Sequence, residues 1–285
     1  MQLPYELFIG LRYTRARRRA DRRNGFISFI SALSVAGIAL GVAALITVLS
    51  VMNGFQKEVR DRMLSVLAHV EIFAAGAPML DWHSVLEKAE RNPRVVAGAP
   101  YVSGQAMLTH DESVRGVLVR GIDPAIEPRV ADFAKHMLRG NLDDLKPGSF
   151  GVAVGRELAN QLLLELGSKL TLIAPQGTAT PAGLVPRLRQ LTVVAIFASG
   201  HYEYDTSLLL MNLEDAAKLF RVQGVTGVRL KTTDMLQAPQ IAAELAASLG
   251  SDVYVRDWSS ENRNWFAAVQ IEKRMMFIIL TLIMA

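Results

Sequence analysis

The feature that most constrains this chain is a run of 33 residues without a charged side chain, from Asn24 to Gln56. The hydrocarbon core of a bilayer takes roughly 20 apolar residues in helical form, so Phe26–Met52 is long enough to span it. A cleavable signal peptide has an apolar region of about 7–15 residues, and this run is about twice as long. The sequence therefore predicts a transmembrane helix within residues 24–56.

The charges that flank this run predict its orientation. Seven arginines and two acidic residues precede it within residues 1–23, whereas KEVRDRM, which follows it, mixes both signs. Positively charged flanks stay in the cytoplasm. We therefore expect residues 1–23 to be a cytoplasmic segment and residues 57–262 to lie outside the cytoplasm. The other 24 basic residues face 25 acidic ones, so the charge distribution does not indicate nucleic-acid binding.

Two patterns inside the predicted span are typical of contacts with other molecules. Gly37 and Gly41 have the spacing that lets a second helix approach closely. Apolar side chains also recur along one face near the outer end of the helix, at Val48, Val51, Met52 and Phe55. Both patterns also occur in helices that contact only lipid, so spacing alone leaves the two alternatives open.

A second apolar stretch closes the chain. Eleven residues without a charge follow Arg274, which is too few to cross a bilayer. We expect residues 263–285 to be the start of a second transmembrane helix that is truncated here.

The region between the apolar stretches is expected to be an α+β domain. Strand-like runs rich in β-branched residues occur at Val66–Phe73, Val114–Ile122, Lys169–Ala174, Leu191–Ala198, Ser207–Asn212, Gly227–Lys231 and Asp252–Asp257. Helical patterns occur at Asp81–Arg91, Arg156–Leu166, Leu213–Phe220 and Met235–Leu249, with Asp81 as an N-cap and Gly250 as a C-terminal signal. Strands and helices do not alternate strictly, which favours α+β over a doubly wound sheet. A seam near Pro147–Gly148 would divide the domain into two lobes, 74–145 and 146–255.

The sequence contains no catalytic motif that we recognise. The five histidines lack metal-site spacing, GSFGVAVG lacks the Lys-Ser/Thr of a P-loop, and the absence of cysteine excludes thiolate chemistry. Glu203 and Asp205 would share one face if HYEYD were extended, and paired carboxylates can serve acid–base catalysis. A membrane-anchored enzyme built on this pair is one alternative. The architecture favours a protein that binds partners or transmits motion across a membrane.

One segment stands apart from the regular elements. QGTATPAGLVPRLRQ, residues 176–190, lies between two predicted strands and is too rich in Pro and Gly for a helix. Prolines fix φ and lower the entropy lost on docking. Composition alone predicts an ordinary surface loop.

Four stretches resemble the lipoprotein-releasing permeases, the LolC/LolE membrane subunits of an ABC transporter in the Gram-negative inner membrane. They are LFIGLRYTRAR at 7–17, GIALGVAALITVLSVMNGFQKEVRDRML at 37–64, VVAIFASGHYEYD at 193–205 and VQIEKRMMFIILTLI at 269–283. The resemblance implies four transmembrane helices and one periplasmic domain of the MacB type, residues 57–262. A MacB- or FtsX-like mechanotransmission protein that acts on another periplasmic partner is the alternative.

The same resemblance implies the partners of the chain. ATP and Mg would bind to a separate LolD-like ATPase, so we expect no cofactor here. The other expected partners are a LolE-like permease or a second copy of this chain, a LolA-like periplasmic chaperone, the lipoprotein substrate and membrane lipids.

The resemblance also implies a role for residues 176–190. In LolC-type subunits a protruding β-hairpin, the hook, recruits the soluble chaperone. Its pattern T-P-x-G-x-x-P-x-x-R is matched by Thr180, Pro181, Gly183, Pro186 and Arg189. Apolar side chains would enter a cleft of the chaperone and two arginines would pair with acids at its rim, namely Ala182, Leu184, Val185, Arg187 and Arg189. Because LolE-type subunits lack this pattern, we expect a LolC-like or a fused LolF-like chain.

Finally, the resemblance implies that the outer ends of helices one and two hold the acyl chains of the lipoprotein. Val48, Val51, Met52 and Phe55 would face Met275 and Met276. Flexible methionine side chains suit a site that accepts many lipids.

Overall fold

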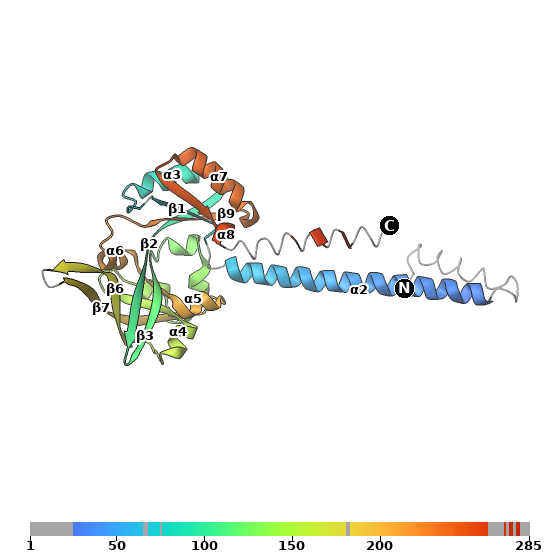
Figure 1. Cartoon of the computed structure of the whole chain (residues 1–285), viewed down its shortest axis with the longest axis horizontal. Coiled ribbons are helices and arrows are strands. Elements are labelled where there is room, and N and C mark those ends of the chain that lie inside the picture. Colours follow the sequence, from blue (N-terminus) through green and yellow to red (C-terminus); the bar gives the residue numbers. More distant parts are fainter. Residues whose placement is uncertain are drawn as a thin grey trace. The chain divides into compact units, whose positions relative to one another are not determined.

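The computed structural model describes residues 25–64, 68–74, 76–180 and 183–261, and residues 271, 274, 275, 278 and 279. The chain divides into two compact units, Met1–Val59 and Arg60–Ala285. The first is helical where it is described, and the second is an α+β unit (Figure 1). The α+β fold expected from the sequence is confirmed.

The first unit is built on α2 (Gly25–Leu64), a helix of 40 residues. Its large apolar side chains are exposed on every side, including Phe29, Leu33, Ile38 and Leu40. Phe29–Met52 has the length and the apolar composition to cross a membrane. A helix that is apolar all round, and of which no part of the described span is buried, is typical of a membrane span. The helix continues beyond Gln56 to Leu64.

The second unit contains a ten-stranded sheet in the order β10-β1-β9-β2-β3-β8-β5-β7-β4, with β6 paired to β2 and β7. The strands are β1 (Val70–Ala74), β2 (Val95–His110), β3 (Ser113–Ile122), β4 (Met137–Arg139), β5 (Gly151–Gly155), β6 (Lys169–Thr180), β7 (Gly183–Phe197), β8 (Leu208–Asn212), β9 (Gly227–Thr232) and β10 (Val253–Asp257). The β3–β8 and β5–β7 pairs are parallel and the others are antiparallel.

Helices pack against this sheet at several places. The longer ones are α3 (Trp82–Glu90), α6 (Leu213–Phe220) and α7 (Ala238–Leu249), and the short ones are α4 (Arg156–Gln161), α5 (Tyr202–Ser207), α8 (Trp258–Glu261) and the 3-10 turns η2 (Glu127–Arg129), η3 (Asp132–His136), η4 (Leu142–Asp144) and η5 (Met235–Gln237). Helices α3 and α7 lie together beside β1 and β9, whereas α6 contacts β2 and β3 (Figure 1). Buried aliphatic side chains from both regions form the main core, and a smaller cluster surrounds Phe133 and Phe197.

Sequence patterns predicted most of these elements. Each of the seven predicted strands overlaps an observed one, and α6 has the predicted bounds. Helix α3 begins after Asp81 as expected, but the Asp81 side chain makes no capping hydrogen bond. Helix α7 ends at Gly250, whose φ of 87° fits the expected glycine signal.

Strands β2, β4 and β5 were missed. In β2, the glycines imitate loop composition. Gly98 and Gly104 lie inside the strand for packing reasons. A Cβ at Gly98 would stand 2.2 Å from the Leu86 side chain, and one at Gly104 would stand 2.5 Å from the Phe220 ring. Glycine therefore lets α3 and α6 approach the strand closely.

A lobe boundary at Pro147–Gly148 does not fit the observed sheet. Strand β8 pairs with β3, and β9 pairs with both β1 and β2. Strands on the two sides of the proposed seam are therefore neighbours in one sheet, and sequence order does not divide the fold at this point.

His69 ties the start of β1 to β9 and to the start of α8. Its Nδ1 accepts a hydrogen bond of 3.0 Å from the Thr232 backbone N–H, and its backbone carbonyl accepts from Trp258 N–H. Burial, together with the charge of Lys231, lowers the pKa of His69 from 6.5 to about 4. The ring is therefore neutral in the fold at neutral pH.

We expect this histidine to make the fold acid-sensitive. Because the pKa of His69 is lower in the folded than in the unfolded state, its contribution to the free energy of unfolding is complete above pH 6.5. This contribution decreases as the pH falls toward 4. The free energy of unfolding is then lower by about 3 kcal/mol near pH 4. Chemical denaturation from pH 7 to 4, compared with His69→Asn, measures it. If both proteins lose stability equally over this range, the histidine is not responsible.

Candidate functional site

The segment at residues 176–190 belongs to a long hairpin. Strands β6 and β7 pair antiparallel from Lys169↔Thr192 to Thr180↔Gly183. The prediction of an ordinary loop from composition is therefore wrong, and the hairpin implied by the resemblance agrees with the observed pairing. Pro181 and Ala182, at its turn, lie outside the described residues.

The base and the outer part of this hairpin differ in their neighbours. At the base, β6 also pairs with β2 and β7 also pairs with β5. Within the described residues, the strands beyond Ala174 and Arg187 pair only with each other, and Figure 1 shows them projecting from the sheet. We call this outer part, residues 174–187, the hairpin arm.

Prolines interrupt the ladder of the hairpin arm. Ala174 pairs with Arg187 and Thr178 with Val185, so residues 175–177 stand opposite Pro186 alone. Pro175 and Pro186 cannot donate backbone hydrogen bonds, which accounts for an irregular pairing here. Leu184 is paired with Ala179 near the end of the arm. The side chains of residues 175–185 lie outside the described ones.

A buried carboxylate organises the contact beneath the arm. Asp215 is fully buried and accepts backbone hydrogen bonds from Gly148 (2.8 Å) and Phe150 (2.9 Å). Phe150 has a left-handed φ of 50°, which these bonds help to hold. The guanidinium carbon of Arg189 lies 3.6 Å from the centre of the Phe150 ring, a cation–π contact.

Arg187 and Arg189, which were expected to pair with acids of the chaperone, differ in their surroundings within this chain. Arg189 is exposed, but its guanidinium rests on Phe150 of its own chain. Arg187 is half-buried, and its Nε has no hydrogen-bond partner within the described residues. Their pairing with acids of a partner stays a prediction.

The apolar face of α2 is accessible in its own unit. Val48 and Val51 are exposed, and Met52 is partly covered. No atom lies within 4 Å of a Cβ placed at Gly37 or Gly41, so this face is open to another helix. Met275 is exposed, whereas Met276 and the side chain of Phe55 lie outside the described residues. The predicted contact between the two helices stays a prediction.

The carboxylate pair Glu203 and Asp205 does not form the site that an extended HYEYD would give. This segment forms α5, with Glu203 exposed and Asp205 buried. Asp205 Oδ1 accepts from the backbone N–H (2.7 Å) and the Oγ (2.6 Å) of Ser199, and Oδ2 accepts from Gly200 N–H (3.3 Å). Asp205 therefore holds the turn before α5 together.

Replacing these carboxylates separates a structural role from a catalytic one. Asp205→Ala leaves buried donors without an acceptor and is expected to lower the free energy of unfolding by about 1–3 kcal/mol. Glu203→Ala is the matched control in the same helix and should leave it within about 0.5 kcal/mol. Denaturation of both variants measures this. Equal stability of Asp205→Ala and the parent protein would contradict it.

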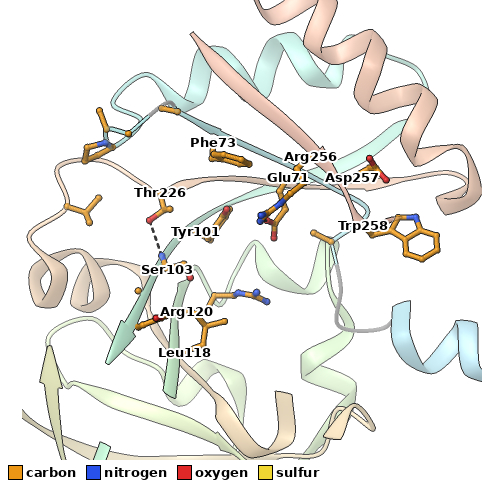
Figure 2. Close-up of a pocket in the computed structure, with 18 of the residues that line it drawn as sticks. Glu71, Phe73, Tyr101, Ser103, Leu118, Arg120, Thr226, Arg256, Asp257 and Trp258 are labelled. Atoms are coloured by element: carbon orange, nitrogen blue, oxygen red, sulfur yellow. Dashed lines mark hydrogen bonds and ion pairs between the residues drawn. The ribbon is translucent and has the colours of Figure 1, made fainter. Parts of the chain in front are cut away.

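A polar pocket of about 680 Å³ lies in the second unit, lined by residues of β1, β2, β3 and β10 (Figure 2). Its charged side chains are Glu71, Arg120, Arg256 and Asp257. Arg256 donates to Glu71 (2.8 Å), and Asp257 accepts from Ser259 N–H and Oγ. No local sequence pattern indicated this pocket, because its lining residues are spread from Ala68 to Trp258. Within the described part of the chain, no three acidic or histidine side chains form a metal site.

Comparison with known proteins agrees with this architecture. Residues 31–248 match the family of the MacB-like periplasmic core domain. The chain is 49% identical over 282 residues to the lipoprotein-releasing system transmembrane protein LolC of Neisseria meningitidis, covering 98% of this chain and 67% of that protein. The LolC of Xylella fastidiosa strain Temecula1 is 44% identical, and the match covers 99% of this chain and 67% of that protein. LolE of Haemophilus influenzae is 26% identical, and the match covers 99% of this chain and 68% of that protein. The chain belongs to the LolC/LolE family, with a MacB-like periplasmic core domain.

Proposed function

We propose that this chain is a permease subunit of a lipoprotein-releasing ABC transporter in the inner membrane. The observation that carries the proposal is the 49% identity to a LolC protein along nearly the whole chain. A subunit of this kind takes lipoproteins from the outer leaflet of the inner membrane and delivers them to a soluble periplasmic chaperone. Residues 57–262 then lie in the periplasm and residues 1–23 in the cytoplasm.

The energetics of the task explain why partners are required. Leaving the bilayer costs an acyl chain about 0.8 kcal/mol for each CH₂ group. Extraction therefore needs coupling to ATP hydrolysis, which we assign to a LolD-like subunit that binds ATP and Mg. It also needs an apolar acceptor for the released chains. A LolE-like permease or a second copy of this chain completes the membrane part.

We assign chaperone binding to the hairpin arm. Strands beyond Ala174 and Arg187 have no further strand neighbour in the described residues, so their backbone edges are available to a partner. Three prolines in the arm lower the entropy that docking costs. The Phe150–Arg189 contact supports the base from which the arm projects.

The first test measures binding between the chain in detergent and a LolA-like chaperone by calorimetry. Pro181→Glu and deletion of residues 178–186 should each weaken binding at least about tenfold, because one buried charge or the loss of the apolar contacts removes more than about 1.4 kcal/mol. Val114→Glu, on the neighbouring β2–β3 hairpin where Val114 is exposed, is the matched control and should bind normally.

Unaltered binding by both arm variants would contradict this assignment. If the intact folded chain binds no LolA-like chaperone at all, a mechanotransmission role with a different periplasmic partner becomes the better explanation.

The second test locates the acyl chains. A photo-crosslinking amino acid at Val48 or Val51 should label the acyl chains of a bound lipoprotein. Ile46 is an equally apolar, exposed position that lies about 160° away from Val48 around the helix, so it should label surrounding phospholipid instead. Equal lipoprotein labelling from Val51 and Ile46 would show that this face of α2 has no special role.

A further inference from the structure

Arg120 is an exception among the buried charges of this fold. The buried charged side chains of the described residues are Arg120, Glu127, Asp205, Asp215 and Arg229. Glu127 and Arg229 form an ion pair, and the two aspartates accept the backbone hydrogen bonds described above. Within the described chain, Arg120 makes no ion pair and no side-chain hydrogen bond, and its Nε is buried without a partner.

The burial of Arg120 makes its missing counter-charge costly for stability. The residue is only 7% exposed, and its guanidinium lies 5.8 Å from the centre of the Tyr204 ring. Removing a charge from water without a counter-charge destabilises a protein. A buried arginine without a counter-charge is therefore better explained by the binding of an anionic ligand than by a contribution to stability.

Arg120 reaches into the polar pocket rather than into the core. Figure 2 shows its side chain extending from β3 toward the space below Tyr101 and the Glu71–Arg256 pair. Tyr101 lines the same pocket, and its burial, together with the charge of Glu71, raises its pKa. The phenol therefore stays protonated and can donate a hydrogen bond to a ligand in the same pocket.

The charges around the pocket define the ligand. Glu71 is paired with Arg256, which leaves Arg120 and Asp257 as the other charged side chains in the lining of the pocket. One negative charge on the ligand would be matched by Arg120. The second negative charge of a dianion such as phosphate would have no cation left to match it and would be repelled by Asp257. Aromatic and aliphatic walls at Phe73, Leu118 and Trp258 suit a group carried on an apolar stem.

We propose that this pocket binds a single carboxylate group, which Arg120 holds through its guanidinium fork and Tyr101 through its hydroxyl. The carboxylate comes from an acidic side chain of a peptide or from a small free acid. Bidentate recognition of a carboxylate is the geometry for which arginine is best suited. The proposal goes beyond lipoprotein release and does not depend on it, because it needs neither the chaperone nor the ATPase.

Calorimetric titration of the full chain in detergent tests this proposal. The probes are acetyl-Ala-Glu-Ala-amide, its Gln analogue, acetate and inorganic phosphate. We expect the Glu peptide to bind at least about tenfold more tightly than the Gln peptide, since a charge-assisted hydrogen bond is lost in the analogue. Acetate that binds as well as the Glu peptide would support the carboxylate site and assign it to free acids.

Variants of Arg120 complete the test. Arg120→Gln should reduce affinity for the Glu peptide at least about tenfold, and Arg115→Gln, an exposed arginine on the same strand, should not change it. If Arg120→Gln fails to fold, Arg120→Lys retains the charge without the fork and should still weaken binding. Equal affinity for both peptides, unchanged affinity in the Arg120 variants, or a preference for phosphate would each overturn the proposal.

Discussion

The rest of the second unit depends on the pairing of one strand, β2. Along its 16 residues it pairs with β9 from Val95 to Tyr101, and with β3 from Tyr101 to His110. Its outer half also pairs with β6. The strand thus joins the region under α3 and α7 to the region that carries the hairpin arm. The buried ion pair of Arg229 with Glu127 lies beside this junction, where Arg229 stands over the Tyr101 ring, so that a loss of either charge would disturb both regions.

Buried charges connect this scaffold to its functional surfaces. Asp215 holds the turn that presents Phe150, and Phe150 supports Arg189 at the base of the hairpin arm. Asp205 holds the turn that leads into α5, whose Tyr204 lies near Arg120. Both carboxylates accept hydrogen bonds from backbone N–H groups, and of the two only Asp205 was a catalytic candidate in the sequence. Arg120 differs, because the fold leaves its guanidinium without a counter-charge.

Particular residues show where sequence reasoning succeeded. The transmembrane helix followed from the absence of charge between Asn24 and Gln56, and α6 followed from local periodicity. The segment HYEYD would have placed Glu203 and Asp205 on one face only if it were extended, whereas the hydrogen bonds of Asp205 hold the start of a helix. The hairpin arm was misread from composition, since its prolines conceal a ladder that pairing across the hairpin maintains.

The sequence by itself determined the properties that are local along the chain. These are the apolar length of α2, the positions of most strands, and the family to which the motifs belong. Only the tertiary structure decided which distant residues meet. Glycines became part of β2 because α3 and α6 pack against it. Arg120, Tyr101, Glu71 and Arg256 came to line one pocket through the pairing of five neighbouring strands, β10-β1-β9-β2-β3. Burial and charge pairing act between residues far apart in the chain, so local patterns carry no record of them.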